Sequence, residues 1–318
     1  MSVEEYTKNA KEATFTLQNG DKIPALGLGT WQSEPNQTRE AVKTALQYGY
    51  RHIDAAHIYG NENEVGDGIK DSGVPRKDIW VTSKLWCNAH TPEAVPVALE
   101  NSLKELKLDY LDAYLIHWPV AFKTGTEKFP KNGDNIIFEN VTIEDTWKAM
   151  EKLVASGKVR HIGISNFNEE NLDRVLKVAS IKPSIHQMEL HPFLPQTDFV
   201  EKHKKLGIHV TAYSPFGNQN AIYGTEIPKL IDHKNIKDVA ASKATGTSGA
   251  NVAVSWAIHR GTSVIPKSVN VNRIKNNFQF VPLSSDEMKE INSIDIRKRF
   301  NQSFPGTKVF TGLQDGNI

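Results

Sequence analysis

The sequence has only one cysteine, Cys87, among its 318 residues. A lone cysteine excludes an internal disulfide framework and a cysteine-rich zinc site, and it fits a reducing compartment such as the cytoplasm. No predicted strand end carries the His-x-His pattern or the carboxylate cluster of a metal hydrolase. We therefore expect a cytoplasmic protein that holds no metal.

The chain also lacks an excess of charge and a long apolar run. Its 38 Lys and Arg residues nearly balance its 37 Asp and Glu residues, for a net charge of +1, which argues against a nucleic-acid partner. No stretch approaches the ~18 uninterrupted apolar residues of a membrane span, and the acidic first residues include no apolar core of a signal peptide. We expect no nucleic-acid and no membrane partner, and a monomer or a homodimer.

Two common nucleotide-binding motifs are missing as well. Gly27-x-Gly29 is followed by Gln32 where the pattern G-x-G-x-x-G needs glycine, and no helix pattern starts there. The pattern G-x-x-x-x-G-K is absent. These absences make an open doubly wound sheet the weaker of two interpretations of the fold.

What the chain does have is a regular alternation of short β-rich runs and longer helical patterns. The eight strand candidates are Leu26–Gly29, His52–Asp54, Ile79–Ser83, Leu111–His117, Val159–Ile164, Ile185–Glu189, His209–Tyr213 and Ser263–Ile265. The eight helix candidates are Thr38–Tyr48, Glu62–Ser72, Glu93–Leu106, Ile143–Ser156, Glu169–Ala179, Asp198–Leu206, Val252–Ile258 and Val271–Asn277. Because parallel strands are joined by crossover helices, this alternation predicts an α/β fold, a (β/α)8 TIM barrel, in a single domain over residues 1–318.

Three segments lie outside this alternation. Thr14–Leu17 and the Asn-Gly turn that follows predict an N-terminal β-hairpin. Residues 120–140 form a long loop after the fourth strand, and residues 298–318 form a tail that carries Phe300, Phe304 and Phe310. Because the loops after barrel strands build the active site, we predict that the tail covers the active-site face. The alternative is that it covers the side of the barrel.

Polar residues stand at the ends of apolar strands. Asp54 and His117 end two strand candidates, Lys84 directly follows the candidate between them, and Tyr59 follows Asp54 in a short loop. In a parallel barrel all four side chains would point towards one mouth. A buried lysine or aspartate costs several kcal/mol unless it is paired, so charged residues at these positions require a partner.

The charged residues at these strand ends can pair with each other. Asp54 can neutralise Lys84, and Lys84 held near Tyr59 would lower the pKa of the phenol from its usual value of about 10. A tyrosine tuned in this way can give a proton to a developing alkoxide, and His117 can hydrogen-bond the same carbonyl oxygen. Each residue alone has a structural explanation, as a helix cap, a packed aromatic, a surface lysine or a core histidine. Their joint placement at matched strand ends favours catalysis.

The segments around these residues resemble the aldo-keto reductases. The matching stretches, in family order, are GYRHIDAAHIYGNENEVG (49–66), VTSKLW (81–86), LDYLDAYLIHWP (108–119), VRHIGISNF (159–167), HQMELHP (186–192), TAYSPFG (211–217) and IPKSVNVNRIKNNF (265–278). Within that family the chain looks most similar to fungal NADPH-dependent aldehyde and ketone reductases. The resemblance implies a (β/α)8 barrel that uses NADPH to reduce a small-molecule carbonyl substrate.

The resemblance also assigns roles to residues. It implies Tyr59 as the general acid, Lys84 and Asp54 as the groups that tune it, and His117 as the group that orients the carbonyl. The implied cofactor contacts are Ser165, Asn166 and Gln187 for the nicotinamide carboxamide, Tyr213 for the nicotinamide face, Ser214 for the pyrophosphate, Lys267, Ser268 and Arg273 for the 2′-phosphate, and Asn277 for the adenine. The implied walls of the substrate pocket are Trp31, Trp86 and Trp118.

Two residues depart from the family pattern. Asn276 stands where many members carry glutamate, and Asn270 stands where threonine or serine is common. Both substitutions would relax the preference for NADPH, so that NADH becomes a weaker alternative cofactor.

Two other functions are compatible with the residues alone. In a barrel-type Schiff-base lyase, Lys84 would be the nucleophile and Tyr59 and His117 would move protons. A redox-sensing module would keep the cofactor site and signal to a partner protein. The segments SPFG and IPKS argue against the lyase, and the complete set of four polar residues argues against the module.

Overall fold

Eight short parallel strands form the centre of the fold in the computed structural model of the chain, which describes residues 12–220, 222, 227–302, 304, 307, 309 and 310. The strands are β3 (Leu28–Gly29), β4 (His52–Asp54), β5 (Trp80–Leu85), β6 (Leu111–Ile116), β9 (Val159–Ser165), β10 (Ile185–Glu189), β11 (His209–Tyr213) and β12 (Ser263–Val264). They lie side by side in the order β12-β11-β10-β9-β6-β5-β4-β3. Their spatial order follows the chain, as expected when each strand pairs with the one before it.

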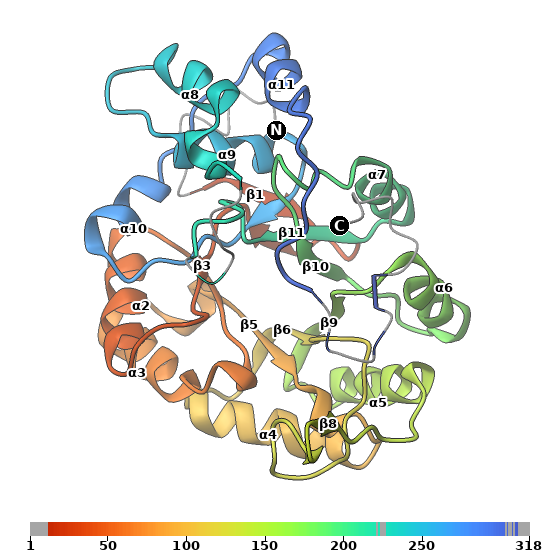
Figure 1. Cartoon of the computed structure of the whole chain (residues 1–318). Coiled ribbons are helices and arrows are strands. Elements are labelled where there is room, and N and C mark those ends of the chain that lie inside the picture. The colour runs from red at the N-terminus through yellow and green to blue at the C-terminus, as the bar shows by residue number, and fades with distance from the viewer. Residues whose placement is uncertain are drawn as a thin grey trace.

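The two edges of this sheet meet. Parallel bridges join Leu26 to Val264 and Gly29 to Lys267, so the first strand lies against the last. A side chain at Gly29 would bring its Cβ to 2.9 Å from the Ile265 carbonyl oxygen, which explains the glycine at this seam. The sheet therefore curls into the arrangement of a (β/α)8 barrel, with the helices around it (Figure 1).

Helices follow the strands and cover the outside of the sheet (Figure 1). They are α2 (Gln37–Tyr48), α3 (Glu62–Ser72), α4 (Ala94–Leu106), α5 (Ile143–Ala155), α6 (Glu169–Val178), α7 (Thr197–Leu206), α8 (Lys234–Ala241), α9 (Gly249–His259), α10 (Val271–Asn277) and α11 (Ser285–Asn292). Local chemistry sets several of their ends: the Asn168 side chain accepts the Asn171 N–H at the start of α6, and Gly207 ends α7 with a φ of 74°.

A hairpin at the start of the described chain covers one end of the barrel. β1 (Thr14–Thr16) pairs antiparallel with β2 (Lys22–Pro24). Leu17 and Ile23 of this hairpin belong to one buried cluster with Trp80 and Ile185, which begin β5 and β10. The hairpin thus lies at the amino ends of the strands and leaves the opposite rim to the connecting loops.

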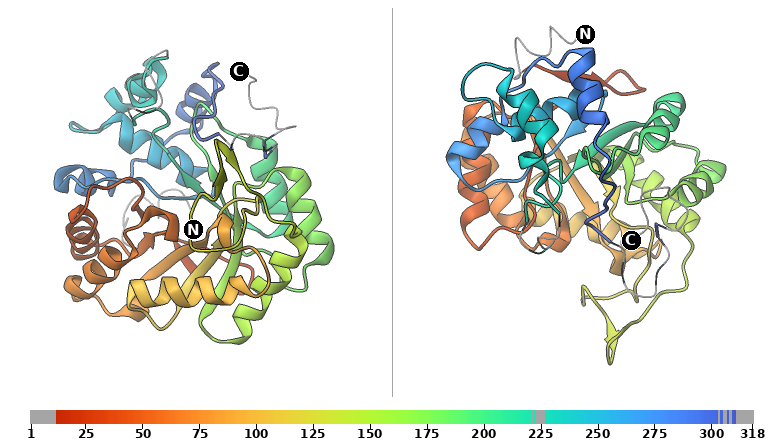
Figure 2. Two further views of the ribbon diagram at one scale, coloured as in Figure 1. Left: turned by 60° about the horizontal axis from the view of Figure 1, so that its bottom comes forward. Right: turned by 45° about the horizontal axis from the view of Figure 1, so that its top comes forward.

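All of the predicted strands and helices are present; five have the predicted bounds, and the ends of the others differ by at most three residues. The sequence interpretation missed α8, α11 and a small hairpin, β7 (Lys131–Asn132) with β8 (Asn135–Ile136), inside the long loop. This hairpin projects away from the barrel (Figure 2). The single domain over residues 1–318 stays a prediction, because both termini extend beyond the described residues.

No helix in the described part of the chain is both long enough and apolar enough to cross a membrane.

Four buried histidines make the fold sensitive to acid. Burial lowers the pKa of His52 and of His90 to about 3 and that of His203 to about 4, and it lowers the pKa of His186 well below the usual value. In the unfolded chain these rings titrate near their ordinary pKa of about 6.5. Below that pH the unfolded state therefore binds more protons than the folded state.

We predict that the free energy of unfolding falls as the pH drops from about 6.5 towards about 4, because each of these histidines then protonates only on unfolding. Urea denaturation at a series of pH values measures this loss. The slope should correspond to more than one proton taken up on unfolding near pH 5. A stability that stays constant between about pH 7 and pH 5 would contradict the burial of these rings.

Candidate active site

The carboxyl ends of neighbouring strands bring the predicted polar residues to one rim. Asp54 is the last residue of β4, Lys84 is the next-to-last residue of β5, and His117 directly follows β6. Tyr59 ends a 3₁₀ turn, His57–Tyr59, that follows β4. Because the strands are parallel, these ends lie on the same side of the barrel.

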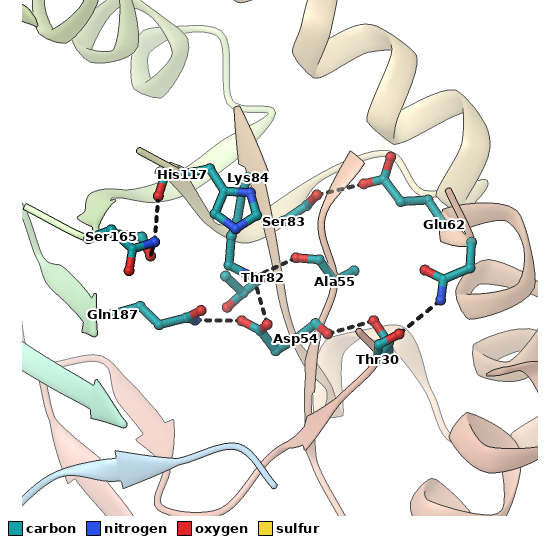
Figure 3. A network of polar contacts seen from close by, with 12 residues as sticks. Thr30, Asp54, Ala55, Glu62, Thr82, Ser83, Lys84, His117, Ser165 and Gln187 are labelled. Atoms are coloured by element: carbon teal, nitrogen blue, oxygen red, sulfur yellow. Dashed lines mark hydrogen bonds and ion pairs between the residues drawn. The ribbon is translucent and has the colours of Figure 1, made fainter. Parts of the chain in front are cut away.

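A buried ion pair lies at the base of this group. Lys84 is fully buried, and its Nζ donates to Asp54 Oδ1 at 2.6 Å and to the Ala55 carbonyl oxygen at 2.8 Å. The other carboxylate oxygen of Asp54 accepts a hydrogen bond from Gln187 Nε2 at 2.6 Å (Figure 3). Burial lowers the pKa of Lys84, and the neighbouring carboxylate opposes that shift. One carboxylate therefore holds a lysine of β5 and a glutamine of β10 together.

Tyr59 and His117 lie next to this pair. Lys84 Nζ is 5.2 Å from the centroid of the Tyr59 ring, and the rings of Tyr59 and His117 meet edge to face with centroids 5.8 Å apart. Burial lowers the pKa of His117 well below its usual value, and the positive charge of Lys84 lowers it further. The imidazole is therefore neutral, and its Nδ1 has no hydrogen-bond partner among the residues that the structure describes.

A cavity of about 1130 Å³ lies against this rim. Lys84 does not line it, because Lys84 is buried in the barrel wall. All the other site residues predicted from the sequence line the cavity, namely Trp31, Asp54, Tyr59, Trp86, His117, Trp118, Ser165, Asn166, Gln187, Tyr213, Ser214, Lys267, Ser268, Arg273 and Asn277. The structure thus brings residues far apart in the sequence into one site.

Asn166, which lines the cavity, directly follows β9 and links it to three other strands. It has a left-handed φ of 61°, and its backbone N–H donates to the Gln187 carbonyl oxygen of β10 at 3.1 Å. Its Nδ2 donates to the His117 carbonyl oxygen at 2.9 Å, and its Oδ1 accepts from the Tyr213 hydroxyl at 2.6 Å. The amide side chain is therefore fixed between β6 and β11, and this fixes the polar wall of the cavity.

One end of the cavity is cationic. Lys267 follows β12, and its Nζ donates to the Gln32 carbonyl oxygen at 2.7 Å. Burial lowers the pKa of Lys267, and the charge of Arg273, in the first turn of α10, lowers it further. Neither cation forms an ion pair with another described residue. Two neighbouring cations with no ion-paired carboxylate in the described part of the chain suit a phosphate group.

The two residues that depart from the family pattern are bound into this end of the barrel. Asn270 is the N-cap of α10, where its Oδ1 accepts the Arg273 N–H at 3.0 Å. Asn276 Nδ2 donates to Ser248 Oγ, the N-cap of α9, at 3.0 Å. Both amides therefore hold the helix ends that border the cationic site.

The other end of the cavity is aromatic. The ring of Phe304, from the C-terminal tail, lies 5.8 Å from Trp86 and 5.2 Å from Trp118, and all three line the cavity. Phe310 lies 5.7 Å from Trp118. The described part of the tail therefore packs on the aromatic wall of the site.

The sequence interpretation missed Glu189, the last residue of β10. Glu189 is fully buried, and its two carboxylate oxygens accept the backbone N–H groups of Phe300 and Asn301, each at 2.8 Å. This carboxylate anchors the tail at the point where Phe300 reaches the cavity. The polar strand-end signal that identified Asp54 was present at Glu189 as well. A second missed group is Gln219, which lines the cavity with its Nε2 unpartnered among the described residues.

Among the described residues, no group of three or more His, Cys, Asp or Glu side chains could hold a metal ion.

Fold and site together define a (β/α)8-barrel protein with an ion-paired lysine beside a large cavity. The profile of the aldo/keto reductase family matches residues 25–296. The chain belongs to this family of oxidoreductases, which confirms the resemblance inferred from its motifs.

Known relatives agree with this assignment. An uncharacterized oxidoreductase of Schizosaccharomyces pombe is 72% identical over 319 residues, which cover 99% of both chains. Aldo-keto reductase family 1 member A1 of Homo sapiens is 43% identical over 294 residues, which cover 89% of this chain and 90% of that protein. The solved structure of the aldose reductase from Schistosoma japonicum is similar with a TM-score of 0.84 and 40% identity, over 90% of this chain and 93% of that chain.

Proposed function

We propose that the protein reduces aldehydes and ketones to alcohols with NADPH, and that Tyr59 donates the proton. The observation that carries the proposal is the fully buried Lys84, paired with Asp54 beside Tyr59, at the wall of a cavity whose other end is cationic. The names of the relatives, which include an aldose reductase, support the same reaction.

The residues that line the cavity fit a nicotinamide cofactor. The volume of about 1130 Å³ exceeds the roughly 300–1,000 Å³ of ordinary ligand pockets, which leaves room for a dinucleotide and a small substrate. The cofactor would supply the hydride. Its carboxamide would be held by Ser165, Asn166 and Gln187, its nicotinamide face by Tyr213, its pyrophosphate by Ser214, its 2′-phosphate by Lys267, Ser268 and Arg273, and its adenine by Asn277.

The chain's own residues move the proton. As hydride reaches the carbonyl carbon, the oxygen becomes an alkoxide and takes the proton from the Tyr59 hydroxyl. The positive charge of Lys84 favours the phenolate that remains, and Asp54 keeps that charge in place. The neutral His117 can donate a hydrogen bond to the same oxygen without competing as an acid.

The aromatic end of the cavity would hold the rest of the substrate. Trp86 and Trp118 offer apolar surface there, Trp31 lines the same cavity, and the His117 ring lies 5.2 Å from Trp86 and 5.8 Å from Tyr59. Such a wall orients a carbonyl and tolerates varied substituents. The cytoplasmic location and the monomeric or dimeric state remain predictions.

The geometry disfavours the Schiff-base lyase. A lysine nucleophile must reach the substrate as a free amine. Lys84 is fully buried, does not line the cavity, and donates to both Asp54 and the Ala55 carbonyl oxygen.

Tyr59→Phe tests the proton donor. It keeps the ring and removes the hydroxyl, so turnover of an aromatic aldehyde with NADPH should fall by at least about 10²-fold, the usual contribution of general acid catalysis. NADPH binding should change little, because the ring remains. A Phe variant with near-normal turnover would refute the role of Tyr59, and a wild type that binds NADPH without turnover would favour the redox-sensing module.

Arg273→Ala tests the cofactor assignment. A charged hydrogen bond is worth roughly 1.5–3 kcal/mol, so the dissociation constant for NADPH should rise by about 10- to 150-fold. NADH lacks the 2′-phosphate and should bind almost as before. The loss for NADPH should shrink as salt rises, because part of it is a screened Coulomb attraction. Equal losses for both cofactors would place Arg273 away from the 2′-phosphate.

A further inference from the structure

Two buried histidines lie behind the cavity wall, on the side of β10 that faces the helices. Successive residues of a strand point to opposite faces, so Gln187 and Glu189 point into the barrel and His186 points outwards. His203 comes from α7, and both histidines are fully buried. Neither lines the cavity, and the proposed reaction uses neither.

A directed chain of hydrogen bonds runs through the two rings. The Phe167 backbone N–H donates to His186 Nε2 at 3.2 Å, His186 Nδ1 lies 2.7 Å from His203 Nε2, and His203 Nδ1 lies 2.6 Å from the Phe199 carbonyl oxygen. An N–H can only donate and a carbonyl oxygen can only accept, so both ends of the chain are fixed. His186 must therefore donate from Nδ1 to His203 Nε2, and His203 must donate from Nδ1 to Phe199.

Both rings are therefore neutral and carry their proton on Nδ1. A further proton would have to enter at a nitrogen that already accepts a hydrogen bond, either from Phe167 or from the partner ring. Burial lowers the pKa of both histidines, to about 4 for His203, which agrees with neutral rings near pH 7. The tautomer of each ring is thus set by its neighbours rather than by water.

The first donor in this series of hydrogen bonds, the Phe167 N–H, belongs to the turn that carries Asn166. Asn166 donates its backbone N–H to the Gln187 carbonyl oxygen, and the next residue, Phe167, donates its own to the His186 ring. Two successive residues of β10 thus hold two successive residues of a turn with a left-handed φ of 61°. Asparagine adopts that conformation more readily than most non-glycine residues, and these two hydrogen bonds hold the turn in it.

We propose that His186 and His203 are positioning residues of the cofactor site, a neutral pair, protonated on Nδ1, that holds the Asn166 turn through Phe167. His186 supplies the acceptor, and His203 keeps the His186 ring in the tautomer that can accept. The inference rests on the proposed function in one respect: it takes the dinucleotide as the ligand that Asn166 contacts.

Two substitutions of His186 separate its two hydrogen bonds. His186→Gln places an amide oxygen near the former Nε2 and can still accept from Phe167. His186→Asn is shorter, keeps a donor near the former Nδ1 and loses that acceptor. His90→Gln is the matched control, because His90 is also buried but lies outside the cavity lining.

Binding of NADP⁺ is measured by quenching of tryptophan fluorescence. We expect the dissociation constant of His186→Asn to rise about fivefold to tenfold, the equivalent of one lost hydrogen bond. His186→Gln and His90→Gln should stay within about twofold of the wild type, even where both lose thermal stability. Recovery by Gln but not by Asn distinguishes positioning from general destabilisation. Equal binding by the two His186 variants would overturn the proposal.

Nitrogen-15 NMR of the wild-type imidazoles tests the pair without any ligand. We expect two neutral rings protonated on Nδ1 that exchange slowly with solvent, whereas an Nε2-protonated or charged ring at either position would overturn the proposal. A wild type that binds no NADP⁺ would instead contradict the proposed function and the cofactor-positioning role with it. In that case the NMR result would still decide whether the pair exists.

Discussion

The ion pair between Lys84 and Asp54 is the constraint on which the site depends. An uncompensated charge in a barrel wall would cost several kcal/mol, so a fully buried lysine requires its carboxylate partner within contact distance. Asp54 meets that need with one oxygen and uses the other to hold Gln187. One carboxylate therefore sets the position of the ammonium group and of a polar residue across the barrel. Tyr59 and His117 therefore lie beside an ammonium group, that of Lys84, which is held in a fixed position.

The remainder of the site is built by linking strand ends to each other. Asn166 connects β6, β9, β10 and β11 through its backbone and its side-chain amide. Glu189 connects β10 to the C-terminal tail and so places Phe300 at the cavity. The lining of the cavity therefore combines these polar groups with two cations, Lys267 and Arg273, and with an aromatic wall that includes Trp86, Trp118 and Phe304. These different linings support the proposal that the cations bind the phosphate of the cofactor and that the aromatic wall binds the substrate.

Much of this arrangement could be predicted from single residues and their spacing. Apolar runs that lead into Asp54, Lys84 or His117 predict the strands. They also predict the rim of the barrel at which the strands end, because a polar or charged side chain is costly to bury without a partner. The same reasoning would have found Glu189 in HQMELHP, and the Ser284-x-x-Glu287 capping box would have found α11. Lys267 and Arg273 could be assigned only through the family resemblance, since two cations at the start of a helix are common on protein surfaces. The His186–His203 pair depends on contacts between β10 and α7 that no local pattern encodes.

The central claim is that this cavity carries out hydride transfer to a carbonyl carbon, with the proton supplied by the protein. The most direct measurement uses NADPH in which both hydrogens on C4 of the nicotinamide are deuterium, together with an aromatic aldehyde and the wild-type enzyme. The account predicts an alcohol with one deuterium on the carbinol carbon. An alcohol without deuterium would contradict it. So would a covalent adduct of the substrate on Lys84 that is trapped by borohydride reduction.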